Sequence, residues 1–231
     1  HRRPMPDELR EQVPLIREVL SAMGIALIMK EGFEGDDLLG TMAVRAEKDG
    51  LDVTIVSGDR DLLQLASEKI KILIPKTKGG KTIEEQYHAE DVKAEYGLTP
   101  LQIIELKALM GDQSDNIPGL PGVGPKTATK ILQMYGTIEE AYEHLDEITP
   151  KKAQTAMREH WDKAVLSRKL AAICTEVPFE ADLKTMRPGN FYTPEAVQLF
   201  KRLGLRRLLS QADLPSDTEK KRTIRQLTDL S

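Results

Sequence analysis

Residues 52–61 read Asp52-Val53-Thr54-Ile55-Val56-Ser57-Gly58-Asp59-Arg60-Asp61, a β-branched run that ends in two aspartates. The run Asp52–Val56 predicts a buried strand, and Asp61–Ala66 predicts a short helix directly after it. Two further apolar segments, Ile25–Met29 and Ile70–Ile74, predict strands on either side along the chain. Strands that alternate with helices in this way predict an α/β fold with a parallel sheet covered by helices.

The remaining segments predict mostly helices. Apolar residues recur at helical spacing over Leu9–Met23, with Pro14 inside the run, and the segment Asp37–Lys48 predicts a second helix. Gly79-Gly80 predicts a hairpin turn. From Ala89 onward the pattern is helical, and three helix starts are predicted where a threonine N-cap precedes a proline, at Thr99-Pro100, Thr149-Pro150 and Thr193-Pro194.

Composition limits the class of protein. The chain has 231 residues, 40% of them hydrophobic and 30% charged, with a net charge of −4, as in ordinary globular proteins. We expect a cytoplasmic protein, because no segment is apolar enough to cross a membrane or to act as a signal peptide. Cys174 is the only cysteine, which excludes an internal disulfide and a cysteine-based zinc cluster. Trp161 is predicted to pack in a helical core.

Seven acidic residues fall at three junctions between predicted segments. They are Glu34, Asp36 and Asp37 after the first strand, Asp59 and Asp61 after the second, and Asp112 and Asp115 in a loop after a helix. For any one cluster alone, an ordinary explanation is that acids cap helix N-termini. Taken together, the clusters predict a shared site, because open α/β folds gather their ligand-binding groups at the carboxyl ends of the strands.

The acidic clusters predict a metal centre. Carboxylates gathered at one sheet edge repel one another unless a cation lies between them, and oxygen-only ligands suit Mg²⁺ or Mn²⁺. Two such ions about 3.5–4 Å apart activate a water and stabilise the leaving oxygen in a displacement at phosphorus. The chemistry then requires neither a histidine nor a lysine base.

A glycine-rich loop follows the third cluster, with the sequence Gly119-Leu120-Pro121-Gly122-Val123-Gly124-Pro125-Lys126-Thr127. It differs from a Walker loop, because Pro125 stands before the lysine and no strand precedes the loop. The loop predicts a helix-hairpin-helix type of turn that leads into a helix over Pro125–Met134 and contacts a DNA phosphate through backbone N–H groups and lysines. The alternative is a turn that serves only to pack two helices. The candidate DNA-binding residues here are Gly119, Gly122, Val123, Gly124, Lys126, Thr127 and Lys130.

Three stretches in order resemble the metal-binding motifs of the 5′-nuclease family, which includes flap endonucleases, phage 5′-exonucleases and the N-terminal domain of bacterial DNA polymerase I. They are Gly32–Asp37, Ser57–Leu65 and Gly111–Gly119. The bacterial polymerase version is the most similar, through Arg3–Arg10 and Leu109–Asp112. The resemblance extends over nearly the whole chain.

The resemblance implies a fold and a set of ligands. It implies a PIN-like (resolvase-like) core with helices on both faces of a parallel sheet over residues 1–98, a helical SAM-like domain over 99–212, and a linker or tail over 213–231. It assigns Glu34, Asp36, Asp37 and Asp59 to a first metal, and Asp61, Asp112 and Asp115 to a second. It also implies a helix-three-turn-helix over Ser114–Lys130 that grips duplex DNA and binds K⁺.

One departure from the family concerns the start of the sequence. Family members begin with a strand that carries a further metal-binding aspartate, followed by helices that form an arch, and neither resembles any part of this sequence. Arg2 matches a basic residue that faces the scissile region in the family. We therefore expect a truncated chain whose parent protein carries a covalently linked polymerase domain.

The expected function is that of a structure-specific 5′-3′ exonuclease or flap endonuclease. Its partner would be DNA with a 5′ flap, nick or end, including an RNA primer–DNA junction, in bacterial primer removal and DNA repair. One alternative is a catalytically silent module that holds duplex DNA through its turn and through Lys151, Lys152 and Arg158. Another is a PIN-like ribonuclease, against which the duplex-gripping turn argues.

Overall fold

The computed structural model describes residues 4–183 and 185–212, and the chain divides into two compact units. The larger unit covers Met29–Phe179. The smaller unit combines both ends of the chain, His1–Ile28 and Glu180–Ser231. Arg2 and the predicted tail 213–231 lie outside the described residues. None of the helices in the described ranges is long and apolar enough to cross a bilayer.

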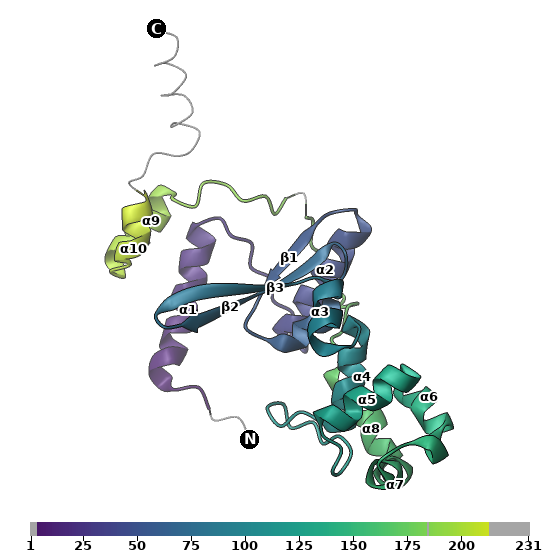
Figure 1. The fold of residues 1–231 in the computed structure, drawn as a ribbon. Coiled ribbons are helices and arrows are strands. Elements are labelled where there is room, and N and C mark those ends of the chain that lie inside the picture. Colours follow the sequence, from purple (N-terminus) through teal and green to yellow (C-terminus); the bar gives the residue numbers. More distant parts are fainter. Residues whose placement is uncertain (1–3, 184, 213–231) are drawn as a thin grey trace. The chain divides into compact units, whose positions relative to one another are not determined.

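The larger unit contains a three-stranded sheet (Figure 1). Its strands are β1 (Val53–Val56), β2 (Ile70–Lys78) and β3 (Lys81–Tyr87), in that order across the sheet. β1 and β2 are parallel, whereas β2 and β3 are antiparallel. The predicted α/β class is confirmed, but the sheet is mixed and not wholly parallel. The reason is the confirmed turn at Gly79-Gly80, because so short a connection joins only antiparallel strands.

The segment Ile25–Met29 was predicted as a strand, and this prediction is wrong. The structure assigns these residues no strand, and Leu27 and Met29 are 41% and 67% exposed. A strand requires a neighbour that pairs with its N–H and C=O groups, and within the described residues β1 pairs only with β2. An apolar β-prone run does not form a strand without such pairing.

Helices cover this sheet and form the first core of the larger unit. Helix α2 (Gly35–Lys48) packs against β1, the 3₁₀-helix η1 (Arg60–Leu65) packs against β2, and α3 (Ala89–Tyr96) packs against β3. The core includes Ile55, Leu62, Leu63, Ile70 and Ile72, each at most 3% exposed. Only three residues separate the end of β1 from the start of η1, so η1 begins near the carboxyl end of this strand.

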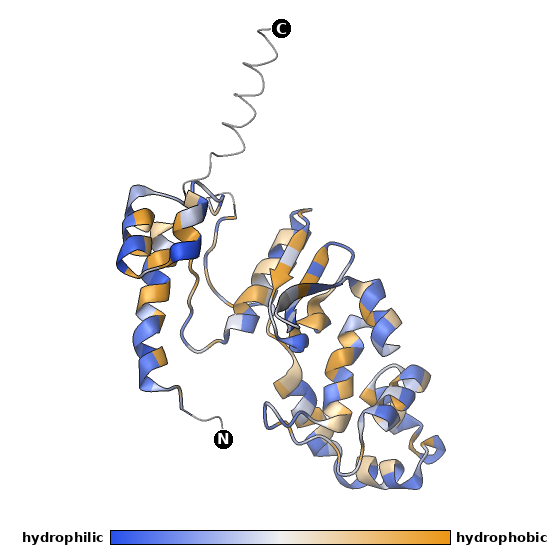
Figure 2. Ribbon diagram, turned by 60° about the vertical axis from the view of Figure 1, so that its left-hand side comes forward, coloured by the Kyte–Doolittle hydropathy of each residue, from blue (hydrophilic) through white to orange (hydrophobic). Residues whose placement is uncertain are grey.

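The rest of the larger unit is helical and has its own core. It contains α4 (Pro100–Met110), α5 (Pro125–Tyr135), α6 (Ile138–Glu143), the 3₁₀-helix η2 (Leu145–Glu147), α7 (Lys151–Glu159) and α8 (Trp161–Ala171). Hydrophobic and hydrophilic residues alternate along these helices (Figure 2), the buried apolar residues form the core, and Trp161 packs against it beside Tyr142, as predicted. The predicted helix start at Thr99-Pro100 is confirmed. At Thr149-Pro150 the prediction is off by one residue, because Pro150 itself is the N-cap of α7.

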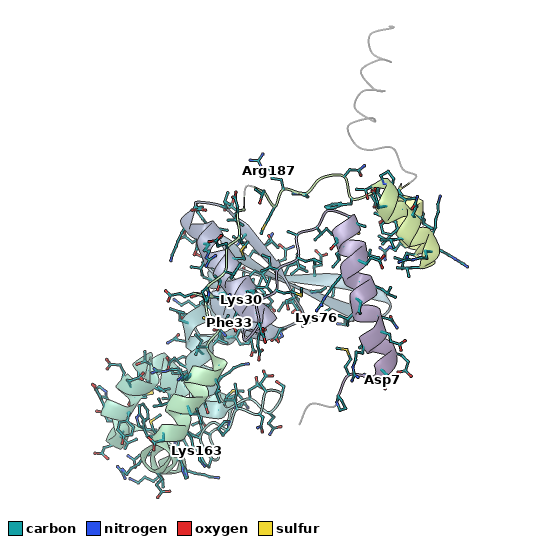
Figure 3. All side chains as sticks on the ribbon, turned by 180° about the vertical axis from the view of Figure 1, so that it is seen from behind. Asp7, Lys30, Phe33, Lys76, Lys163 and Arg187 are labelled. Atoms are coloured by element: carbon teal, nitrogen blue, oxygen red, sulfur yellow. The ribbon has the colours of Figure 1, made fainter. Side chains whose placement is uncertain are left out.

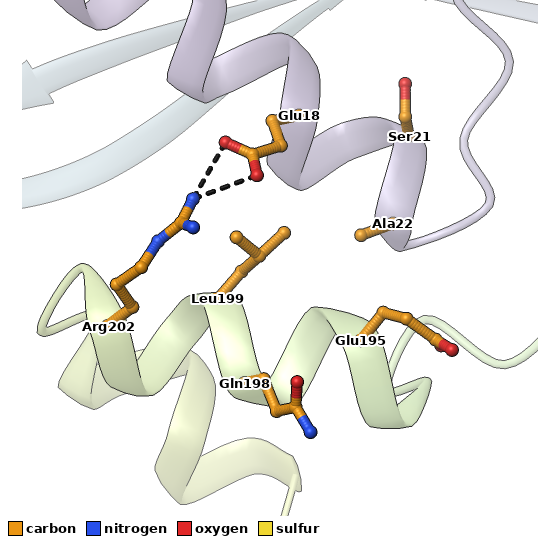
Figure 4. Close-up of a pocket in the computed structure, with 7 residues that line it drawn as sticks. All are labelled: Glu18, Ser21, Ala22, Glu195, Gln198, Leu199 and Arg202. Carbon is orange, nitrogen blue, oxygen red and sulfur yellow. Dashed lines mark hydrogen bonds and ion pairs between the residues drawn. The ribbon is translucent and has the colours of Figure 1, made fainter.

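The smaller unit consists of α1 (Asp7–Ala22), α9 (Pro194–Arg202) and α10 (Arg206–Ala212). The predicted first helix is confirmed, with Pro14 inside it. Val19 packs with Phe200, and the Arg202 guanidinium donates to the Glu18 carboxylate at 2.8 Å across a shallow pocket (Figure 4). Thr193 caps α9, as predicted, and its hydroxyl also donates to the Ala22 carbonyl at 2.8 Å.

Candidate metal centre

Three of the predicted acidic residues come together in the larger unit. Asp61 lies on η1, and Asp112 and Asp115 lie in the loop that follows α4. Carboxylate oxygens of the three side chains lie within 4.8 Å of one another. Two segments separated by the whole of β2, β3, α3 and α4 therefore meet at one acidic cluster. Its oxygen-only ligands are those that hard divalent cations prefer.

Backbone hydrogen bonds fix the loop that carries Asp112. Its N–H donates to the Ile117 carbonyl at 2.9 Å, and the Ile117 N–H donates back to the Asp112 carbonyl at 2.7 Å. The Asp112 carboxylate also accepts from the Ser114 N–H at 2.8 Å. At the end of the loop, the Gly119 N–H donates to the buried Ser167 hydroxyl at 3.0 Å. The loop therefore holds Asp112 at a defined position beside α8.

The turn between β1 and η1 orients Asp61. The Asp59 carboxylate accepts from the Asp61 N–H at 2.9 Å, and so caps η1. Between the two aspartates, the Arg60 guanidinium donates to the Glu85 carboxylate at 2.8 Å and to the Tyr96 hydroxyl. Because Arg60 is anchored on β3 and α3, its two acidic neighbours are held at the start of η1.

The acids at the start of α2 have different surroundings. Asp37 accepts two backbone hydrogen bonds, from the Glu34 N–H at 3.1 Å and from the Cys174 N–H at 2.9 Å. Burial raises the pKa of Asp36, and the negative charges of Asp59 and Asp61 raise it further. Asp36 therefore interacts electrostatically with the acids of η1, whereas Asp37 is tied into the backbone.

Lys107 on α4 is part of this centre, although the sequence patterns did not identify it. Its ammonium nitrogen lies 2.6 Å from an Asp112 carboxylate oxygen and also contacts the Asp61 carboxylate. The residue is only 8% exposed. One signal was present in the sequence: Lys107 falls four residues after Ile103, a spacing that places two residues on the same face of a helix.

The charges around Lys107 shift the pKa values of its partners. Burial alone would raise the pKa of Asp112, but hydrogen bonds from Lys107 and Ser114 outweigh it and lower the pKa to about 2. Burial raises the pKa of Asp61, although the hydrogen bond from Lys107 opposes this rise. The pKa of Lys107 is raised, because its bonds to Asp112 and Asp61 outweigh its burial. The acidic cluster thus stabilises positive charge, which fits a divalent cation.

The glycine-rich turn continues from this loop. Gly119 and Gly122 have positive φ angles of 58° and 74°, and Val123 is buried. A Cβ atom on Gly119 would lie 2.2 Å from the Gly111 nitrogen, so the backbone segments at Gly119 and Gly111 can lie this close only because residue 119 is glycine. Gly124 is the N-cap of α5, one residue before its start at Pro125, where the predicted helix begins.

The first turn of α5 borders a shallow cleft. Lys126, Thr127 and Lys130 line it together with Thr149 and Pro150. The two lysines are exposed, and amide groups in the first turn of a helix have no partner within the helix. This surface combines amide donors with positive charge, which is the chemistry that binds phosphate.

Two family models match the chain. The model described as "5'-3' exonuclease, N-terminal resolvase-like domain" matches residues 1–97, and "5'-3' exonuclease, C-terminal SAM fold" matches residues 98–193. Among curated proteins, the chain is 46% identical over 220 residues to DNA polymerase I of Bacillus caldotenax. This match covers 95% of the chain and 25% of that polymerase. DNA polymerase I of Bacillus subtilis (strain 168) is 45% identical over 210 residues, 91% of the chain and 24% of the polymerase. The chain thus spans about a quarter of the length of these relatives.

Solved structures share the fold. A T5 5′-exonuclease structure with bound zinc ions has a TM-score of 0.55 at 24% identity and covers 64% of this chain and 53% of its own. The catalytic core of Rad2 in complex with a DNA substrate has a TM-score of 0.52 at 19% identity and covers 87% and 66% of the two chains. These similarities confirm the predicted resolvase-like and SAM-like fold.

Proposed function

The chain belongs to the 5′-3′ exonuclease family, and we propose that it hydrolyses DNA phosphodiester bonds near a 5′ end with the help of divalent cations. The observation that carries this proposal is the convergence of Asp61, Asp112 and Asp115 within 4.8 Å. The DNA-contacting turn begins at Gly119, only four residues after Asp115. Metal ligands and a phosphate-binding surface are therefore offered by one continuous segment.

The proposed ions are two Mg²⁺ or Mn²⁺. Asp61, Asp112 and Asp115 would hold one ion, and Glu34, Asp36, Asp37 and Asp59 would hold the other. Such ions lower the pKa of a bound water and stabilise negative charge at phosphorus. The protein's own contribution is to hold its carboxylates in fixed positions through the hydrogen bonds of the Asp112 loop and of η1. The negative charges of Asp59 and Asp61 raise the pKa of Asp36, which supports the proposal that the first two acidic clusters belong to one site.

The proposed DNA contact lies at the start of α5. Amide groups of this helix, Lys126, Thr127 and Lys130 would bind phosphate oxygens, and Gly119, Gly122, Val123 and Gly124 would let the backbone approach closely. Contacts of this kind carry no base readout, so binding would depend on DNA structure and not on sequence. A K⁺ ion in the segment Ser114–Lys130 stays a prediction, as does the contact by Arg2.

The proposed substrate is DNA with a 5′ flap, nick or end, or an RNA primer–DNA junction, in primer removal and repair. We place this activity in the bacterial cytoplasm, because the substrate is chromosomal DNA and the two relatives named above are bacterial polymerases. In a parent protein of the relatives' length, a polymerase domain would be covalently linked. We keep residues 1–98 as the resolvase-like core, 99–212 as the DNA-binding helical domain and 213–231 as the linker or tail.

Cleavage of a 5′-labelled flap duplex tests the proposal. The reaction is run with Mg²⁺, with Mn²⁺ and with EDTA, on the wild type and on Asp112→Asn, which removes a negative charge at nearly constant shape. Asp146→Asn is the matched control, because the Asp146 side chain is 92% exposed and forms a surface ion pair with Arg158. We expect metal-dependent cutting that Asp112→Asn abolishes and Asp146→Asn preserves.

Two other outcomes have clear meanings. If the wild type binds the flap duplex with metal present but does not cut it, the chain acts as a silent DNA-binding module. If it neither binds nor cuts, the proposed function is wrong. The silent module has less support, because three of the seven carboxylates proposed to hold the cations, those of Asp61, Asp112 and Asp115, gather in one place.

A further inference from the structure

Lys107 is buried to a degree that is rare for lysine. Only 8% of the residue is exposed, and the ammonium group extends from α4 into the acidic cluster. A charge removed from water requires partners of the opposite charge. Lys107 has two, the Asp61 carboxylate and the Asp112 carboxylate, the latter at 2.6 Å. The side chain therefore bridges η1 to the loop after α4.

The two partners of Lys107 are also two of the three residues that could hold a metal ion. Asp61, Asp112 and Asp115 present oxygens within 4.8 Å of one another, and the lysine nitrogen lies against two of these carboxylates. An ammonium group and a divalent cation would thus compete for the same two carboxylate groups, those of Asp61 and Asp112. Two cations a few ångströms apart also repel each other strongly in a partly buried site.

From this geometry we propose that Lys107 is an internal cation of the metal centre, which a divalent ion displaces. In the metal-free chain, the ammonium group offsets the repulsion between Asp61 and Asp112 and keeps the ligands together. When an ion binds, the carboxylates exchange the ammonium group for the metal. Lys107 thus preorganises the centre and also weakens its affinity for metal. This inference rests on the proposed metal site.

The competing explanation is a permanent salt bridge. In that case Lys107 would stay on Asp61 and Asp112 whether or not metal is bound, and its removal would loosen the ligands and weaken metal binding. The two explanations predict opposite changes in metal affinity, so affinity decides between them. Activity alone does not, since a failure to cut DNA would follow from either.

The test is a titration with Mn²⁺, in which free Mn²⁺ is measured by electron paramagnetic resonance. Three full-length chains are compared: the wild type, Lys107→Met, and Lys163→Met as the matched control. Lys163 is exposed on α8 (Figure 3), and it forms no ion pair with any of the residues that the structure describes. We expect Lys107→Met to bind Mn²⁺ about tenfold more tightly, and Lys163→Met to bind like the wild type.

A second measurement separates metal displacement from general loss of structure. In EDTA the melting temperature of Lys107→Met should fall below that of the wild type, and saturating Mn²⁺ should remove this difference. The Lys107 ammonium signal in a ¹⁵N-lysine spectrum of the wild type should shift when Mg²⁺ is added. If Lys107→Met does not fold, Lys107→Gln replaces it, because the amide can still donate to one carboxylate.

The outcomes for this inference and for the proposed function are distinguishable. Equal or weaker Mn²⁺ binding by the neutral variants, or an ammonium signal that Mg²⁺ leaves unchanged, would overturn the displacement of Lys107 while the metal site stands. Failure of the wild type itself to bind Mn²⁺ would instead reject the metal site, and with it the proposed function.

Discussion

The Asp37 carboxylate accepts a hydrogen bond from the Cys174 backbone N–H at 2.9 Å, although the two residues are 137 positions apart in the chain. The segment around Cys174 is held against α2 by further bonds. The Val177 N–H donates to the Thr41 hydroxyl at 3.1 Å, and the Arg45 guanidinium donates to the Val177 carbonyl at 2.9 Å. Asp37 thus fixes the start of α2 to the last segment of the larger unit, in addition to its proposed role at the metal centre.

Replacing Asp37 by asparagine should destabilise the protein. Both carboxylate oxygens accept from backbone N–H groups, those of Glu34 and Cys174. An amide keeps only one acceptor oxygen, and its NH₂ group would face the other donor. We expect the free energy of unfolding in EDTA to fall by about 1–2 kcal/mol in urea titrations. Asp52→Asn, at an exposed site before β1, should change it by less than about 0.5 kcal/mol. Equal effects of the two changes would contradict a structural role for Asp37.

Replacing Asp36 by asparagine should have the opposite effect on the metal-free protein. Burial disfavours the charge of Asp36, and so do the nearby charges of Asp59 and Asp61. The neutral amide removes this repulsion, so the melting temperature in EDTA should rise. If Asp36 also binds metal, the stabilisation of the variant by saturating Mn²⁺ should be smaller than that of the wild type. Scanning calorimetry with and without Mn²⁺ measures both effects. A lower melting temperature in EDTA would refute the electrostatic argument.

Alanine at Gly119 should disrupt the loop that links the acids to the turn. The residue has a φ of 58°, and an added Cβ would lie 2.2 Å from the Gly111 nitrogen. This nitrogen is a backbone atom, so relieving the clash would require the backbone itself to shift. We expect a loss of about 3 kcal/mol or more in the free energy of unfolding. Gly124→Ala is the control, because Gly124 has a φ of −98° and no atom within 4 Å of an added Cβ. Similar losses in both variants, measured by urea denaturation, would show that the close approach is not the cause.

The paired change Lys126→Ala with Lys130→Ala should weaken DNA binding without affecting metal binding. Both lysines are exposed and line the cleft at the start of α5. Removing one lysine–phosphate interaction reduces the slope of log affinity against log salt by about one, so the double variant should reduce it by about two. Fluorescence anisotropy with two unrelated duplex sequences at several salt concentrations measures this slope. A slope equal to that of the wild type would place the DNA-binding surface elsewhere.

Glu105 should make the stability of the helical part depend on pH. Burial raises its pKa above the ordinary value of 4.5, although it accepts from the Ile138 N–H at 3.1 Å. The folded state therefore binds this proton more tightly than the unfolded state. The free energy of unfolding falls as the pH rises from about 4.5 through the raised pKa of the folded state. Glu105→Gln does not titrate and keeps an acceptor for Ile138. Its stability relative to the wild type should thus be greater at about pH 7 than at about pH 4. An unchanged difference in urea titrations at the two pH values would reject this assignment.

Sequence patterns predicted those parts of the fold that depend on local interactions. Helical spacing located the first helix, the glycine-rich loop located the helix that begins at Pro125, and paired glycines located the hairpin at Gly79-Gly80. The acids were predicted to share a site because three clusters stood at predicted segment junctions, and the structure brings Asp61, Asp112 and Asp115 together. In each case the signal lies within a few residues, where helix periodicity, capping and turn geometry act.

Tertiary structure decided what depends on partners distant in sequence. The segment Ile25–Met29 has strand-like composition but forms no strand, because composition does not supply a pairing neighbour. Likewise, the Asp37 carboxylate accepts from the distant Cys174 N–H, and Lys107 enters the acidic cluster from a helix in which no sequence pattern identified it. The sequence thus determined which residue types are available to the proposed metal centre. Only the folded chain decided which of them meet, since long-range hydrogen bonds and charge pairs exist only after the segments pack.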